Sequence, residues 1–183
     1  MTVPVRLAAL SLFAIAAVSL SGCGSSKDEV KAENESAESV AAKVAASDIK
    51  PRAGQWESTM KIEKLEMKGL PPEAASAMQK QMGMAQTFAT CLTPEEAEKP
   101  NAGFFQGNKG TDCQYEKFSM AGGAIDAVLT CKQGGQSQHM TMKGKYAEDS
   151  YDIRITSDGE AQPGMPMSMA MTISSKRTGE CKS

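Results

Sequence analysis

The sequence predicts an all-β domain: an antiparallel meander of about seven strands, curved into a barrel or half-barrel and cross-linked by disulfides. Apolar and polar residues alternate over several short segments between residues 55 and 173, which is the pattern of strands with one buried face. Turn-forming residues separate these segments, and four cysteines are spread among them. One or two short helices complete the expected architecture.

The first strand is expected over residues 55–62, where Trp56, Ser58 and Ile62 share one face. The apolar residues change parity at Leu65, which indicates a bulge near residues 63–64.

Two helices are expected on either side of the second strand. Residues 72–81 form the first, with a proline in its first turn, and would cover an open end or an edge of the sheet. Residues 86–92 form the second strand. The sequence Thr93-Pro94-Glu95-Glu96 then has the cap, proline and acid order of a helix start, which gives one turn before Pro100.

The C-terminal half predicts hairpins and a final strand. A turn at Glu148-Asp149 would set Tyr146 opposite Tyr151 and so match apolar to apolar residues, with Met142 opposite Ile155. The last strand alternates from Met165 to Ile173.

The four cysteines of this domain predict two disulfides. An even number of cysteines is typical of a disulfide framework, and no pair has the CxxC spacing of a metal site. The glycine pair at 122–123 suits a tight hairpin turn that brings Cys113 opposite residue 131 or 132. A Cys113–Cys131 bridge is therefore expected, and elimination pairs Cys91 with Cys181.

The N-terminus predicts a lipoprotein signal peptide over residues 1–22. An apolar run over residues 7–20 follows a single Arg6 and is too short for a stable transmembrane helix. It ends in a sequence that resembles the lipobox of bacterial lipoproteins, namely Leu20, Ser21, Gly22 and Cys23. We expect Leu20, Ser21 and Gly22 to be recognised by the signal peptidase and the Cys23 thiol to accept lipid.

The predicted location is the periplasmic face of the outer membrane. Two or three acyl chains of the palmitate kind on Cys23 would hold the protein stably in a bilayer. The residue after it is Gly24, whereas an aspartate there tends to retain similar lipoproteins at the inner membrane. Residues 23–50 comprise the lipidated cysteine and a flexible tether with transient helix near 35–46, and residues 51–183 form a single β domain.

Composition and motifs exclude several function classes. Residues 51–183 carry 15 Lys plus Arg against 16 Asp plus Glu, without a basic stripe, so no nucleic acid is expected as a partner. The sequence holds one histidine, His139, which is expected on the solvent-facing side of its strand. It contains no P-loop, GxSxG, HExxH or GxGxxG motif. We therefore predict no enzyme activity, no catalytic residues and no cofactor.

Methionine is abundant, with 13 in the chain, and suggests two further hypotheses. Thioethers are soft donors that suit Cu(I), but alternating methionines also build an ordinary core face, and they can line a cavity for a small apolar ligand. The candidate metal-binding methionines are Met140, Met142, Met165, Met167, Met169 and Met171.

Three ordered motifs are similar to those of the domain of unknown function 3617 family of exported bacterial proteins. They are residues 51–57 (PRAGQWE), residues 91–95 (CLTPE) and residues 176–181 (KRTGEC). The resemblance spans residues 51–183 and implies export and fold, but no activity and no catalytic residues.

The leading hypothesis is a non-catalytic binding or structural module, anchored at the membrane, whose partner is an unknown periplasmic protein or a small apolar ligand. The alternatives are a methionine-rich Cu(I)-binding protein and a carrier of an apolar ligand.

Overall fold

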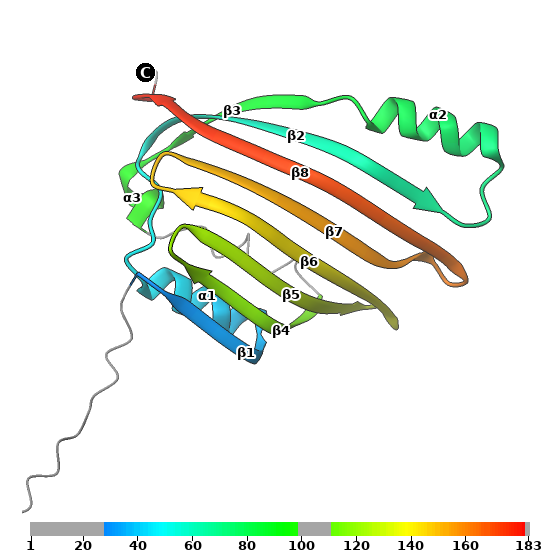
Figure 1. Ribbon diagram of the computed structural model, residues 1–183, viewed down its shortest axis with the longest axis horizontal. Helices are drawn as coiled ribbons and strands as arrows, with labels where there is room; N and C mark the ends of the chain where they lie inside the picture. The colour runs from blue at the N-terminus through cyan, green and yellow to red at the C-terminus, as the bar shows by residue number, and fades with distance from the viewer. Residues whose placement is uncertain (1–27, 99–110, 182–183) are drawn as a thin grey trace, which may run out of the picture.

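Eight antiparallel strands form one curved sheet in the computed structural model, which describes residues 28–98 and 111–181. The sheet order is β1-β4-β5-β6-β7-β8-β2-β3, and its two outermost strands do not pair with each other. The sheet is therefore an open half-barrel (Figure 1). Its strands are β1 (Val30–Ser36), β2 (Gly54–Met67), β3 (Gln86–Leu92), β4 (Asp112–Ala121), β5 (Ala124–Gln133), β6 (Gln136–Ala147), β7 (Ser150–Gln162) and β8 (Met165–Gly179).

The predicted all-β class is confirmed. Of the two predicted shapes, a barrel or a half-barrel, the structure is the half-barrel. The seven strands expected after residue 50 are β2 to β8. Their order differs from a simple sequential meander, because β3 does not pair with β4 and β2 pairs with β8 as well as with β3. The long strands β2 and β8 match apolar residues on one face, with Met60 opposite Ile173 and Ile62 opposite Met171.

Three short helices accompany the sheet in the described residues: α1 (Ala37–Ala46), α2 (Pro72–Met82) and α3 (Pro94–Glu98). The predicted start of α3 is a capping box. The Thr93 amide donates to Glu96 Oε2 at 2.9 Å, and the Glu96 amide donates to Thr93 Oγ1 at 3.2 Å. The backbone hydrogen bond from Thr93 lowers the pKa of Glu96. Helix α2 buries no residue and projects at one end of the sheet (Figure 1).

The predicted hairpins have the expected registers. Ala121 pairs with Ala124 around Gly122 and Gly123, whose φ angles of 58° and 76° lie in the left-handed region that favours glycine. In the β6–β7 hairpin, Tyr146 pairs with Tyr151, and Met142 pairs with Ile155. The bulge near residues 63–64 is confirmed as a register shift between β2 and β8.

Both predicted disulfides are confirmed. Cys113 and Cys131 face each other in the β4–β5 register, with their Cα atoms 4.0 Å apart. Cys91 and Cys181 join the edge strand β3 to the chain after β8, with a Cα separation of 5.3 Å. The second bridge closes the longer loop, of 90 residues against 18.

The predicted flexible tether of residues 23–50 is wrong over residues 30–46. Strand β1 pairs with β4 from Val30 opposite Met120 to Ser36 opposite Gln114. Ser36 then caps α1 by accepting a hydrogen bond from the Ser39 amide at 3.2 Å. The boundary predicted at residue 51 therefore excludes a strand and a helix that belong to the same sheet and core.

The main core lies on the concave face of β1, β4 and β5, where α1 packs against it. The buried residues of α1 follow the helical period, at Ala37, Val40, Ala41 and Val44. Tyr115 and Phe118 of β4 meet edge to face with ring centroids 5.2 Å apart. Burial raises the pKa of Tyr115 far above its usual range.

Truncating α1 should therefore destabilise the fold. Val40 is fully buried, so Val40→Ala should lower the free energy of unfolding by about 2 kcal/mol. The control Glu38→Gln changes an exposed residue of the same helix and should stay within about 0.5 kcal/mol. Urea unfolding measures both, and equal stability of the two variants would show that this segment is a tether after all.

The two disulfides should differ in their contribution to stability. In the chain-entropy model, opening Cys91–Cys181 by Cys→Ala pairs should cost about 4.6 kcal/mol, and opening Cys113–Cys131 about 3.2 kcal/mol. Thermal unfolding of the two double variants measures the order. A larger loss for Cys113–Cys131 would contradict the loop-length argument.

Candidate functional site: an apolar pocket at one end of the half-barrel

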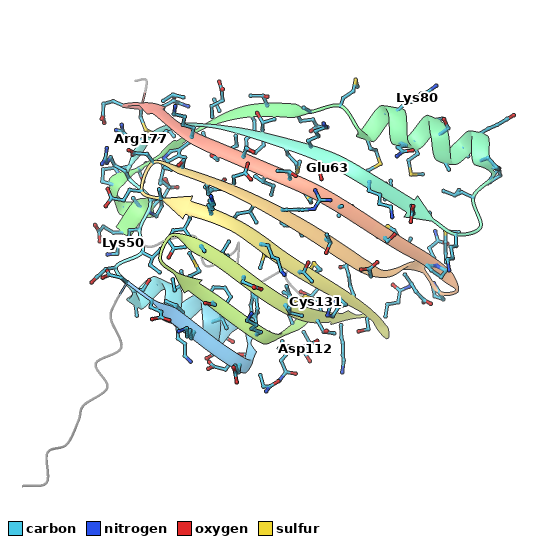
Figure 2. All side chains as sticks on the ribbon, in the orientation of Figure 1. Lys50, Glu63, Lys80, Asp112, Cys131 and Arg177 are labelled. Atoms are coloured by element: carbon cyan, nitrogen blue, oxygen red, sulfur yellow. A yellow bond between two sulfur atoms is a disulfide. The ribbon has the colours of Figure 1, made fainter. Side chains whose placement is uncertain are left out.

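A cavity of about 600 Å³ opens on the concave face at one end of the sheet. Its walls come from β2, β3, the β4–β5 and β6–β7 hairpins, β8, and the segment that joins α1 to β2. Lys50 and Arg177 lie at this end, and Lys80 of α2 lies at the other (Figure 2). The cavity therefore collects residues from nearly the whole length of the described chain.

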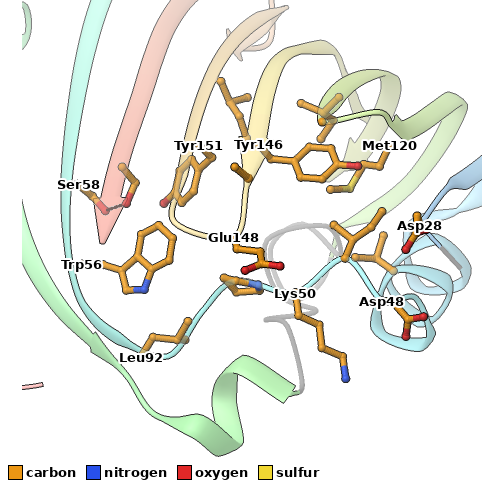
Figure 3. Close-up of a pocket in the computed structure, with 18 of the residues that line it drawn as sticks. Asp28, Asp48, Lys50, Trp56, Ser58, Leu92, Met120, Tyr146, Glu148 and Tyr151 are labelled. Carbon is orange, nitrogen blue, oxygen red and sulfur yellow. Dashed lines mark hydrogen bonds between the residues drawn. The ribbon is translucent and has the colours of Figure 1, made fainter. Parts of the chain in front are cut away.

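Three aromatic rings shape the cavity: Trp56, Tyr146 and Tyr151 (Figure 3). Trp56 and Tyr151 stack with centroids 6.1 Å apart and an interplanar angle of 27°. The Trp56 indole Nε1 donates to the Arg52 carbonyl at 3.0 Å, which satisfies its polar atom outside the cavity. The ring thus presents its apolar surface to the pocket.

Gly54 allows the start of β2 to approach the end of β8, which sets Trp56 in place. Its φ is 140°, and a Cβ there would collide with the Gly179 carbonyl oxygen. The Arg177 Nε also donates to the Ala53 carbonyl at 2.6 Å. The Gly-x-Trp order in the opening motif of the domain therefore has a steric reason.

One polar pair lies in the apolar wall. Ser58 Oγ and Ser175 Oγ are 2.7 Å apart on β2 and β8, and both residues are buried. Either hydroxyl can be the donor, and the pair lines the cavity. Two hydroxyls joined in this way retain a second proton, which can be donated to a polar group of a bound molecule.

The charged residues of the lining mark the rim of the cavity, because their side chains are exposed or half-buried. Asp28, Asp48, Lys50 and Glu148 belong to the lining, and Figure 3 shows the Lys50 side chain extending away from the rings. Lys50 Nζ lies 2.5 Å from Glu98 Oε2. Glu148 contacts Arg52 at 3.2 Å, as does Asp149.

Burial and nearby carboxylates change the pKa of the Tyr146 hydroxyl. Burial raises the pKa of Tyr146, and a hydrogen bond with the Gly123 backbone opposes this shift. The carboxylates of Asp28 and Glu29 raise it further. These two carboxylates therefore make the electrostatic potential at the Tyr146 hydroxyl more negative.

The predicted methionine stripe lies on the same concave face, beyond the pocket. Met165, Met167, Met169 and Met171 are half-buried along β8. Met142 of β6 is 5% exposed in the main core, with Ile155 of β7 between it and Met171. Met140 is separated from Met169 by Ser157 in the same way. The four methionines of β8 thus form a broad apolar surface, the methionine floor. Cu(I) binding by these residues stays a prediction.

The remaining predicted residues are His139 and the lipobox-like residues. His139 is exposed on the convex face, as expected, with Nε2 3.9 Å from Glu116 Oε1. Leu20, Ser21, Gly22 and Cys23 lie outside the described residues. Within residues 28–98 and 111–181, no three or more His, Cys, Asp or Glu side chains are grouped so that they could hold a metal ion. That part of the chain also has no helix of the length and hydropathy needed to span a membrane.

The fold and pocket define a class: an open antiparallel half-barrel with an apolar cavity on its concave face. Residues 51–181 match the model of a family described as "Protein of unknown function (DUF3617)". The chain belongs to this family, which confirms the resemblance found in its three motifs. The match covers β2 to β8, whereas β1 and α1 precede it. No curated protein and no solved structure matches the chain.

The pocket residues follow only partly from the sequence. The alternation of the first strand places Trp56 and Ser58 on one face, and the second hairpin sets Tyr146 opposite Tyr151. Nothing in the local pattern brings these two pairs together. Their meeting depends on the pairing of β2 with β8, across more than 100 residues of sequence.

The serine pair should contribute to stability as a buried hydrogen bond. Ser58→Ala leaves the Ser175 hydroxyl without this partner and should cost about 1–2 kcal/mol, whereas adding Ser175→Ala should cost little more. The control Thr59→Val breaks the exposed Thr59–Thr87 pair and should change stability by no more than roughly 0.5 kcal/mol. Denaturant unfolding of Ser58→Ala, Ser175→Ala, the double serine variant and Thr59→Val tests this, and fully additive serine effects would contradict it.

Proposed function

We propose that this protein is a membrane-anchored lipoprotein whose half-barrel binds a small apolar molecule without converting it chemically. The observation that carries this proposal is the cavity of about 600 Å³ on the concave face. Small-molecule sites in proteins are commonly concave, mostly apolar, and about 300–1,000 Å³ in volume. The cavity meets each of these criteria.

The chemistry of the walls supports an apolar ligand. Trp56, Tyr151 and Ile153 offer ring and aliphatic surface, and the serine pair offers one polar point that can fix the ligand's orientation. The half-barrel is open, and the methionine floor on β8 continues its concave face. Flexible thioether side chains adapt to ligands of different shape.

The charged groups near the cavity support binding more than catalysis. The polar atom of Trp56 is used by the Arg52 carbonyl, and Lys50 and Arg52 are engaged with carboxylates at the surface. These contacts stabilise the rim and leave the apolar walls to form the binding surface. We therefore assign the pocket a role in holding a ligand.

The proposed anchor is a lipid on Cys23, with the domain on the periplasmic face of the outer membrane. The support is the N-terminal sequence: a single Arg6, an apolar run, and the lipobox-like residues 20–23 followed by Gly24.

Trp56 provides a direct test of ligand binding, because it is the single tryptophan of the chain and is 4% exposed in the pocket wall. A dibrominated long-chain alcohol should quench its fluorescence in the mature chain carrying Cys23→Ser. Thr90→Phe narrows the pocket beside Trp56 and should weaken binding about tenfold, or by about 1.4 kcal/mol.

The matched control is Ala89→Phe, which adds the same ring to the opposite face of the same strand and should leave quenching unchanged. If the alcohol does not quench Trp56 in the parent chain, or if both ring variants behave alike, the pocket does not bind apolar molecules in the proposed way.

The anchor has a separate test. Cys23→Ser should abolish lipidation, because the thiol that accepts lipid is lost. Intact-mass measurement should show the mass of the acyl chains on the parent protein alone. A parent chain that begins elsewhere than at residue 23, or carries no lipid, would contradict the anchor.

A further inference from the structure

The proposed anchor and the pocket mouth are joined by very few residues. Asp28 lines the pocket, and five peptide links separate it from Cys23. Even a fully extended chain of this length spans at most about 18 Å. A lipid on Cys23 would therefore hold the mouth of the pocket close to the membrane surface.

The strand and helix that replace the expected tether create this constraint. A flexible chain over residues 24–50 would have let the domain move about 30 Å from its anchor. Instead, β1 begins at Val30 and is paired with β4 across its length. The domain is thus fixed to the anchor at the same end at which its cavity opens.

The rim charge limits the kind of molecule that fits. Five carboxylates and two cations lie at or next to the described rim: Asp28, Asp48, Glu98, Glu148, Asp149, Lys50 and Arg52. The excess of negative charge would repel an anionic polar group and attract an ammonium group. The apolar walls begin directly inside this rim, at Trp56 and Tyr151.

We propose that the pocket takes a lipid directly from the bilayer that anchors the protein, and that it selects a lipid whose headgroup is zwitterionic or cationic over an anionic one. This inference rests on the proposed function and names its ligand class and source. An acyl chain would lie against Trp56 and Tyr151 and continue toward the methionine floor of β8. The headgroup would remain at the acidic rim.

Bromine quenching of Trp56 tests both parts of the proposal with the lipidated protein. The protein is reconstituted in vesicles of equal phosphatidylethanolamine and phosphatidylglycerol, with brominated acyl chains on one lipid at a time. Quenching should be at least about twofold stronger when phosphatidylethanolamine carries the bromine. Equal quenching, or stronger quenching by phosphatidylglycerol, overturns the proposed selectivity.

A spacer variant tests the source of the lipid. An insert of about twenty Gly and Ser residues after Gly24 adds a flexible span of about 25 Å and should at least halve quenching by vesicle lipid. Quenching by the soluble brominated alcohol should not change. If the spacer leaves vesicle quenching intact, proximity to the anchor is not what loads the pocket, although the proposed binding function stands.

A further outcome separates the bilayer lipid from the protein's own acyl chains. If those chains fill the pocket, neither brominated lipid quenches the lipidated protein, while the alcohol quenches the Cys23→Ser chain. This result overturns the inference. Absence of quenching by the alcohol as well overturns the proposed function itself.

Reversing the rim charge tests the stated cause of selectivity. Asp28→Lys with Asp48→Lys should shift the preference toward phosphatidylglycerol, because two of the exposed carboxylates at the mouth become cations. Glu73→Lys, on the exposed surface of α2 away from the pocket, is the control and should keep the original preference. An unchanged preference in the double variant contradicts the electrostatic explanation.

Discussion

Strand β8 holds the sheet together, because it pairs with β7 on one side and with β2 on the other. These ladders join the opening of the family domain to its end, and the Cys91–Cys181 bridge closes the same region covalently. The pocket depends on this pairing. Trp56 and Ser58 come from β2, Ser175 from β8 and Tyr151 from β7, and they meet only when β8 lies between its two neighbours.

The N-terminal segment changes the relation between the domain and its proposed anchor. Val40 and Val44 of α1 are buried in a core made by β4 and β5, and β1 pairs with β4, which would otherwise be the outermost strand. The apolar residues of α1 recur at helical spacing, so the signal for this helix was present in the sequence. Their side chains are small, however, and the strand before them is polar. Only the concave surface of β4 and β5 provides enough contact to order them.

The half-barrel divides its concave face between two uses. Helix α1 fills the part beneath β1 and β4, where Tyr115 and Phe118 are almost completely buried. The part formed by β7, β8 and β2 carries Trp56, Tyr151 and the serine pair of the pocket, together with the half-buried methionines. A domain that only needed stability would gain by covering this surface as well. The proposed binding of an apolar ligand gives a reason for leaving it open.

The sequence by itself determined the elements whose information is local. Alternation located β2, β6, β7 and β8. Gly122-Gly123 and Glu148-Asp149 set two hairpin registers, and the first of these placed Cys113 opposite Cys131. Tertiary structure alone decided that β2 joins β8, that β1 and α1 belong to the core, and that Trp56 stacks on Tyr151 above a pair of serines. The physical reason is that a hairpin turn fixes the strands it connects. A pairing between distant strands depends instead on the burial of whole faces, which no single segment encodes.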